Sequence, residues 1–120
     1  MNIIAQILIG IIAVLHAYIL WLEMFAWESR GPKVFADFER ELFPKTKVMA
    51  GNQGLYNGFL AGGLVWSLLV ADLAWKTNIA TYFLICVAIA GAYGAATASR
   101  RILYVQTVPA VIALIFVHLV

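Results

Sequence analysis

A chain of 120 residues with this composition does not describe a soluble domain, because 64% of its residues are apolar and only 12% are charged. Globular proteins average about 45–50% and about 25% for these classes, and a chain this short has too little interior to hide the surplus apolar surface from water. The composition excludes a cytosolic enzyme and a disordered tail. A net charge of +2 excludes a nucleic-acid binder built on a basic patch, and one cysteine, Cys86, excludes an internal disulfide and a cysteine metal cluster. The expected partner is the lipid bilayer.

Four apolar segments are long enough to cross a membrane, which takes about 20 mostly apolar residues. The first segment is not expected to be a cleaved signal peptide, because no Lys or Arg precedes it and no small-residue cleavage site follows. We expect an all-α fold, an integral membrane four-helix bundle that forms a single domain over residues 1–120. The expected helices cover about 3–27, 53–75, 79–98 and 102–119.

The loop between the first two segments carries its own helical pattern. Pro32 suits the first turn of a helix and Pro44 is expected to end it. This pattern predicts a short amphipathic helix over about 32–43 that lies at the membrane interface, with a lid over a site in the bundle as the alternative. Its apolar face would hold Val34, Phe35, Phe38 and Leu42.

The distribution of Lys and Arg predicts the orientation, since such residues accumulate in cytoplasmic loops. It places both termini outside the cell and the 28–51 loop in the cytoplasm, in a multi-pass inner-membrane protein. Arg30, Lys33, Arg40, Lys45 and Lys47 lie in the long loop and Arg100 and Arg101 in the third connection, against Lys76 alone in the second.

Polar side chains inside the hydrocarbon are costly, so their positions indicate where a site could lie. At about 1.5 Å per residue, His16 is expected near mid-membrane and Glu23 near the cytoplasmic end of the same helix face. Gln53 and Asn57 are four residues apart on the second helix, at the expected depth of Glu23. The candidate ligand-binding residues are His16, Glu23, Asn52, Gln53, Asn57, Tyr93, Thr97 and Tyr104.

Each of these groups also has a purely structural explanation. Amides often do no more than join helices by hydrogen bonds. Glu23 could form an ion pair with Arg100, Arg101 or a lysine of the loop, and His16 could be a core histidine with satisfied ring nitrogens. These alternatives stay open at this point.

Away from the expected depth of Glu23, the sequence has few residues that could form a catalytic or binding site. Asp72 and Lys76 are four apart at a helix end and are expected to form a surface ion pair. His16 and His118 are expected at depths too different to hold a haem together, and no metal-ligand spacing is present. No cofactor and no metal are therefore expected.

Small residues predict where helices approach one another closely. Gly54, Gly58 and Gly62 repeat every four residues along the second helix, and the third helix is rich in Gly and Ala around Gly91 and Gly94. We expect these two sets to pack against each other in the cytoplasmic half. A homodimer contact through the same glycines is the alternative.

One segment carries a resemblance to a known family. Asn52-Gln53-Gly54-Leu55-Tyr56-Asn57-Gly58-Phe59-Leu60-Ala61, preceded by His16 and Glu23, resembles the small bacterial four-helix membrane proteins catalogued as domain of unknown function 1304. The resemblance covers the whole chain. It implies an integral membrane protein of similar length and carries no settled activity, substrate or catalytic residue.

Two classes of function remain, beside a structural or accessory role. The first is a binder or transporter of a small amphipathic or cationic molecule, with Glu23 as the charge of the pocket. By analogy this is the mode of the small multidrug-resistance transporters, although the one-sided charge bias departs from their balanced pattern. The second is a membrane enzyme on an isoprenoid or quinone, with His16 and Glu23 as an acid–base pair.

Overall fold

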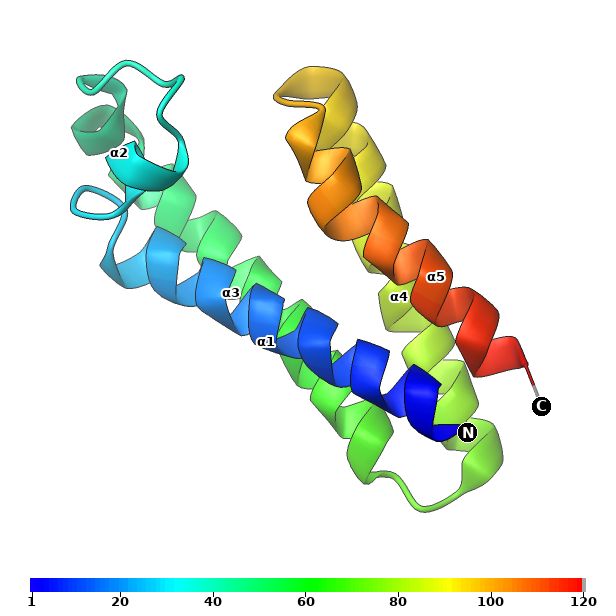
Figure 1. Ribbon diagram of the computed structural model, residues 1–120. Coiled ribbons are helices and arrows are strands. Elements are labelled where there is room, and N and C mark those ends of the chain that lie inside the picture. The colour runs from blue at the N-terminus through cyan, green and yellow to red at the C-terminus, as the bar shows by residue number, and fades with distance from the viewer. Residues whose placement is uncertain (120) are drawn as a thin grey trace. The chain divides into compact units, whose positions relative to one another are not determined.

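The computed structural model describes residues 1–119, which form an all-α fold with four long helices and short ones (Figure 1). The fourth long helix begins with a π-helical turn, η1, that continues directly into α5. Two helices, α1 and α4, are long and apolar enough to cross a membrane, and the stretch Leu103–His118 is a shorter apolar helix. The elements are α1 (Ile3–Phe25), α2 (Gly31–Val34), α3 (Leu42–Leu69), α4 (Leu73–Thr97), η1 (Leu103–Thr107) and α5 (Val108–His118).

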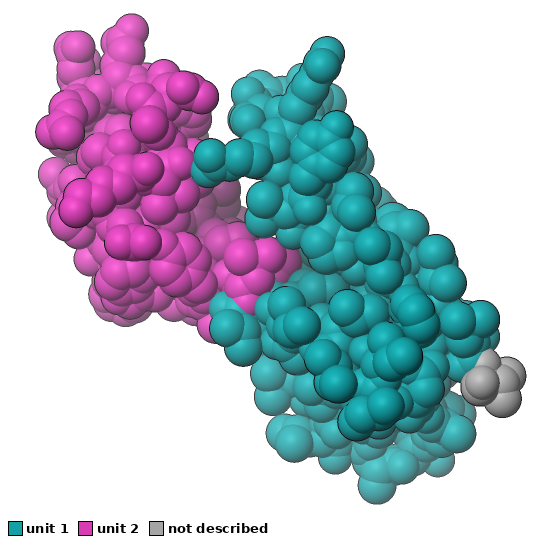
Figure 2. Space-filling view, viewed as in Figure 1, with its two compact units in different colours: residues 1–14, 60–120 teal, residues 15–59 magenta. Residues whose placement is uncertain are grey.

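The chain divides into two compact units, which Figure 2 shows in different colours. Unit 2 is residues 15–59: the C-terminal half of α1, the loop with α2, and the first part of α3. Unit 1 holds the rest of the described chain, including α4, η1 and α5.

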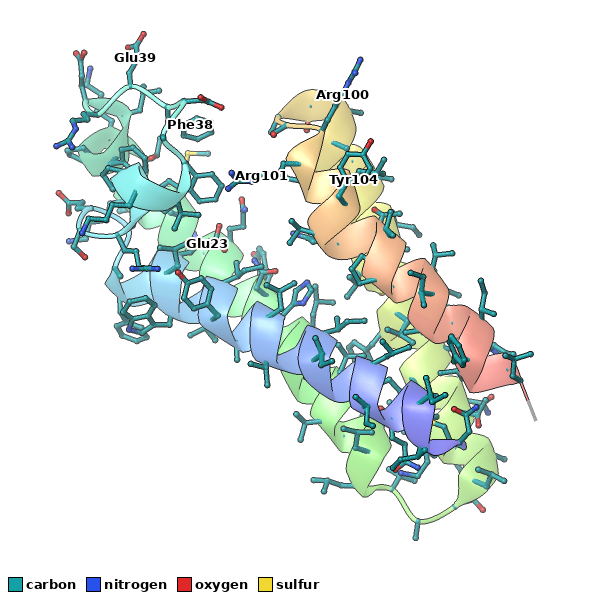
Figure 3. All side chains as sticks on the ribbon, viewed as in Figure 1. Glu23, Phe38, Glu39, Arg100, Arg101 and Tyr104 are labelled. Carbon is teal, nitrogen blue, oxygen red and sulfur yellow. The ribbon has the colours of Figure 1, made fainter. Side chains whose placement is uncertain are left out.

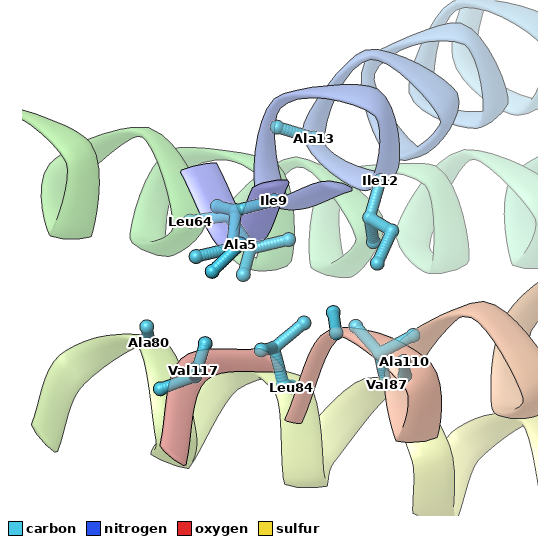
Figure 4. Close-up of a cluster of buried hydrophobic side chains, with 11 residues drawn as sticks. Ala5, Ile9, Ile12, Ala13, Leu64, Ala80, Leu84, Val87, Ala110 and Val117 are labelled. Atoms are coloured by element: carbon cyan, nitrogen blue, oxygen red, sulfur yellow. The ribbon is translucent and has the colours of Figure 1, made fainter. Parts of the chain in front are cut away.

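The core of unit 1 is an apolar cluster drawn from four helices (Figure 4). Helix α1 contributes Ile9 and α3 contributes Leu64, while α4 contributes Leu84, all three without exposed surface. Small residues of α5 complete the contact and allow it to lie close to α4. The buried members are Ala5, Ile9, Ile12, Ala13, Leu64, Ala80, Leu84, Val87, Ala110, Ala113 and Val117.

One side chain ties the two ends of unit 1 together. Oδ1 of Asn2 accepts a hydrogen bond from the backbone N of Ala5 at 2.8 Å, which caps the start of α1. Its Nδ2 donates to the carbonyl O of Phe116 at 2.7 Å and to that of Leu119 at 3.3 Å. The first residues of α1 therefore lie beside the last turn of α5.

The expected ion pair between Asp72 and Lys76 was wrong, because both residues cap helix ends instead. Oδ2 of Asp72 accepts from the backbone N of Trp75 at 2.9 Å and so starts α4 at Leu73, six residues before the expected start. Nζ of Lys76 donates to the carbonyl O of Leu68 at 2.7 Å and to that of Ser67 at 3.1 Å. These carbonyls end α3 at Leu69 rather than near residue 75, and a cation is favourable there.

The fourth helix lies where the sequence predicted it, with one irregular turn. Pro109 has no backbone N–H, so the carbonyl four residues earlier cannot receive a normal helical bond from it. The widened turn η1 lies directly before this proline and accommodates the missing bond.

The short helix predicted over about 32–43 is present only in part. It is confined to Gly31–Val34, the segment 35–41 is not helical, and α3 begins at Leu42, eleven residues before the expected start near 53. Pro44 does not end a helix: it is the third residue of α3, where its missing N–H removes no hydrogen bond. Proline is common in the first turn of a helix, and Pro44 takes this place in α3.

The aromatic residues of this loop nevertheless pack together. The ring of Trp27 lies 5.0 Å from that of Phe43 and 5.6 Å from that of Phe35, measured between centroids. Phe38 stacks on Phe35 at 5.6 Å. Nε1 of Trp27 donates to Oγ1 of Thr46 at 3.0 Å. The loop is thus held against α1 and α3 by ring contacts rather than by helical periodicity.

The two glycine sets pack closely against helices, but the partners expected from the sequence were wrong. A Cβ on Gly58 would meet the side chain of Leu20 on α1, and one on Gly54 would also meet α1. On α4, a Cβ on Gly91 would lie 2.8 Å from the backbone N of Thr107, and one on Gly94 would lie 2.9 Å from Cγ2 of Ile102. Gly62 has no atom within 4 Å of such a Cβ, so no close approach requires it.

Candidate functional site

Glu23 lies on the buried face of α1, in unit 2 (Figure 3). Only 3% of its surface is exposed. The apolar pattern of α1 explains this position, because the neighbouring Leu22, Ala26 and Trp27 are buried as well. A carboxyl group in such a place is costly unless hydrogen bonds satisfy it.

Two amide side chains of α3 satisfy the Glu23 carboxyl group. Nε2 of Gln53 donates to Oε2 at 2.9 Å, and Nδ2 of Asn57 donates to Oε1 at 2.8 Å. Nδ2 of Asn57 also donates to the carbonyl O of Gln53 at 3.1 Å. These bonds agree with the depth argument that placed the three side chains at one level. We call Glu23, Gln53 and Asn57 the Glu23 cluster.

Gly54 allows α3 to approach α1 at this level. A Cβ on Gly54 would lie 2.8 Å from Cγ of Met24 and 3.0 Å from Cβ of Glu23. It would also lie 3.2 Å from the carbonyl O of Leu20. The missing side chain therefore makes room for the backbone of α1, which lets the short amide side chains reach Glu23. The glycine spacing predicted Gly54 as a packing residue, but it gave no sign that Gly54 lies against Glu23.

His16 shares the buried face of α1 with Glu23 and has no exposed surface. Seven residues of helix separate the two, which corresponds to about 10 Å along the axis. The partners of the Glu23 carboxyl group in unit 2 are the two amides, not the imidazole. A directly bonded acid–base pair of His16 and Glu23 is therefore not formed.

The remaining candidate residues lie away from this cluster or outside unit 2. Asn52 is exposed on α3, although it directly precedes Gln53. Tyr93 and Tyr104 belong to unit 1 and are 72% and 67% exposed (Figure 3 labels Tyr104). Thr97, also in unit 1, donates its hydroxyl to the carbonyl O of Tyr93 at 2.7 Å, as is common for Thr in helices.

No cation of unit 2 lies beside the carboxyl group of the Glu23 cluster. Both partners of the carboxyl group there are neutral amides. Lys47, one of the loop lysines considered as a partner, pairs instead with Glu28 at 3.1 Å on the surface. Each carboxyl oxygen accepts one amide hydrogen bond and retains a further lone pair for a ligand.

Metal binding has no obvious place in the part of the chain that the structure describes. Within residues 1–119 no three His, Cys, Asp or Glu side chains are grouped so that they could hold a metal ion. The chemistry open to the Glu23 cluster is therefore that of a carboxylate with two oriented amides.

Comparisons with known proteins agree with the resemblance of the Asn52–Ala61 segment. A family model described as "Protein of unknown function (DUF1304)" matches residues 10–118. The chain is 29% identical over 117 residues to the "Uncharacterized protein YpaA" of Lactococcus lactis subsp. lactis (strain IL1403), covering 96% of this chain and 97% of the relative. No solved structure matches the chain significantly.

Proposed function

Because the chain belongs to the DUF1304 family, whose description assigns no activity, we propose its function from the geometry of the Glu23 cluster. The protein is an integral membrane protein that binds a small amphipathic cation at Glu23 and moves it across or within the bilayer. Gln53 and Asn57 orient the carboxylate.

Membrane location is supported by the large apolar surface of the helices. In the most apolar window of α1 and in that of α4, only 28% is buried, whereas the core helix of a soluble protein is mostly buried. The exposed apolar side chains of α1 recur at spacings of three and four residues, as on a lipid-facing surface. The residues of this series are Ile4, Ile7, Ile11, Val14, Tyr18, Trp21 and Phe25, and Ile3 beside its first member is exposed too.

Two observations support the orientation with both termini outside. The Asn2 hydrogen bonds hold the start of α1 beside the end of α5, which favours an even number of crossings. The charge bias of the connections favours a cytoplasmic location for residues 28–51.

The observation that carries the proposal is a buried carboxyl group whose partners in unit 2 are neutral. Glu23 is 3% exposed, and removing such a group from water is costly unless a counter-charge or strong hydrogen bonds compensate. The amides compensate in part and leave the site electrostatically suited to a cation. An amphipathic cation would pair with the carboxylate and place its apolar part among the apolar side chains nearby.

The enzymatic alternative, an acid–base reaction on an isoprenoid or quinone, needs His16 and Glu23 to act on one substrate. The helical separation of about 10 Å is too long for direct proton transfer, so a substrate would have to extend between them. The buried position of His16 on the same face is the observation that keeps this alternative. In the accessory alternative, the Glu23 cluster does no more than join α1 to α3.

Ligand protection tests the proposal. Tetraphenylphosphonium, an amphipathic cation, should raise the Tm of the purified protein in detergent, and the uncharged isostere tetraphenylmethane should not. Glu23→Gln preserves the shape of the side chain and keeps one acceptor oxygen, and the Gln53 amide can turn so that its oxygen accepts from the new NH2 group. The variant removes the charge, so the protection should be lost while the fold persists. Glu39→Gln, which removes the same charge from the exposed loop, should behave like wild type.

The same measurement separates the alternatives. Protection of wild type and of Glu23→Gln to the same extent would refute Glu23 as the cation site. Protection by an isoprenoid alcohol or a quinone that depends on both His16 and Glu23 would favour the enzyme. No protection by any of these ligands would favour the accessory role.

A further inference from the structure

Arg30 lies alongside the end of α1 rather than pointing away from it. Its Nε donates to the hydroxyl of Tyr18 at 2.6 Å, and its guanidinium carbon lies 5.9 Å from the centroid of the Tyr18 ring. Tyr18 in turn contacts Trp21, with ring centroids 5.8 Å apart. The sequence pattern gave no sign of this arrangement, because twelve residues and a turn separate Arg30 from Tyr18.

This contact places a cation beside the C-terminal third of an apolar helix. Helix α1 ends at Phe25, and Tyr18 lies seven residues earlier, about 10 Å along the axis. The chain therefore folds back after α1 and brings the guanidinium group to that level. On the N-terminal side of Tyr18 the same face of α1 continues with the exposed aliphatic side chains Ile11 and Val14.

The positive charge of Arg30 has no acidic partner in unit 2. Its bond to Tyr18 uses Nε, and the two terminal nitrogens of the guanidinium group face no carboxylate there. Glu28, the acidic residue nearest in sequence, pairs with Lys47. Tyr18 and Trp21 are 37% and 45% exposed, and Arg30 is exposed too, so a ligand can reach all three.

We propose that Tyr18, Trp21 and Arg30 form a binding site for the headgroup of an anionic phospholipid. The terminal guanidinium nitrogens donate to the phosphate oxygens as a planar fork, and the Tyr18 hydroxyl fixes the orientation of that fork. Tyr and Trp are suited to the headgroup level because each ring has an apolar body and a polar tip. The acyl chains lie along the aliphatic face of α1. The occupant is a lipid rather than free phosphate, because the apolar face next to the cation would otherwise stay uncovered.

Lipid titration by native mass spectrometry of the purified protein tests this site. Phosphatidylglycerol should bind wild type more tightly than phosphatidylcholine with the same acyl chains. Arg30→Gln should weaken phosphatidylglycerol binding about tenfold, the effect of losing charge-assisted hydrogen bonds. Arg40→Gln removes the same charge from an exposed position of the same loop and should bind like wild type. Tyr18→Phe keeps the ring and should lose part of the preference, because Arg30 is then no longer held.

The possible results distinguish a phospholipid from free phosphate as the ligand, and the Arg30 site from the Glu23 site. Equal affinities of wild type, Arg30→Gln and Arg40→Gln for phosphatidylglycerol would overturn the proposal. Competition by inorganic phosphate at the same concentration as the lipid would also overturn it, because the acyl chains would then contribute nothing. Glu23→Gln should leave phosphatidylglycerol binding unchanged, so the outcome is independent of the cation site.

Discussion

Nδ2 of Asn57 lies 2.8 Å from Oε1 of Glu23, and this bond joins two helices whose residues are 34 positions apart in the chain. The same nitrogen donates to the carbonyl O of Gln53 at 3.1 Å, so the amide of Asn57 is fixed in one orientation. The position of the Glu23 carboxyl group thus depends on α3 as much as on α1.

Removal of the Asn57 amide should destabilise the protein. Asn57→Leu leaves Oε1 of Glu23 buried without its donor, and we expect a loss of about 1–2 kcal/mol in the free energy of unfolding. Asn52→Leu is the matched control, because Asn52 lies on the same helix with an exposed side chain. The Tm of the two variants in detergent measures the difference. Equal Tm values would show that the bond to Glu23 adds nothing to stability.

Because α1 and α3 approach closely at Gly54, a side chain at this position should destabilise the protein. Gly54→Ala forces a methyl group against Cβ of Glu23 and the carbonyl O of Leu20, a backbone atom that cannot turn away. Overpacking of this kind costs about 1–3 kcal/mol. Gly62→Ala, where a Cβ meets nothing, should be neutral or stabilise by up to about 1 kcal/mol through helix propensity. If thermal unfolding ranks the two variants in the opposite order, the assignment of Gly54 to this contact is wrong.

Lys76 should stabilise the end of α3 by its hydrogen bonds to the carbonyl groups of Ser67 and Leu68. Lys76→Met keeps a similar length of apolar side chain but removes the donors, and we expect a loss of about 1 kcal/mol. Lys33→Met removes a lysine from the exposed loop and should change stability much less. Chemical unfolding of the two variants in mixed micelles provides the comparison, and an equally large effect of Lys33→Met would point to net charge instead of capping.

Cysteine labelling tests the membrane orientation. With Cys86 replaced, a cysteine at Lys45 should react with a membrane-impermeant maleimide only from the cytoplasmic side. A cysteine at Ala71, in the short connection between α3 and α4, should react only from outside. If the cysteines at both positions react from the same side of the membrane, the four-crossing arrangement is contradicted.

The Glu23 cluster could be predicted from the sequence because its geometry follows from helix dimensions. Two antiparallel helices with a known rise per residue bring Glu23, Gln53 and Asn57 to one level. Polar side chains at the same level of an apolar bundle form hydrogen bonds with one another. That Glu23 is also the charge of a ligand site stays a prediction.

The helix ends were harder to predict, because hydropathy does not register single capping residues. Asp72 and Lys76 lie inside an apolar stretch, yet one starts α4 and the other completes α3. Pro44 is compatible with the end of one helix and with the start of another, so this residue alone does not distinguish the two. The repeated glycines predicted close contacts that the structure has at Gly54 and Gly58 but not at Gly62, and small side chains do not specify which helix will fill the space. The partners of Gly54 and Gly91 therefore had to come from the structure.

The hydrogen bonds of Asn2 to the last turn of α5 make the chain suitable for circular permutation. A short linker could join the start of α1 to the end of α5 without moving either helix, and new ends could be opened in the segment 35–41, which contains no helix. Such a permuted chain would begin with α3 and finish with α1 and the short α2. In the proposed orientation its ends would lie on the cytoplasmic side, where a fluorescent protein that matures only in the cytoplasm could be fused to either of them.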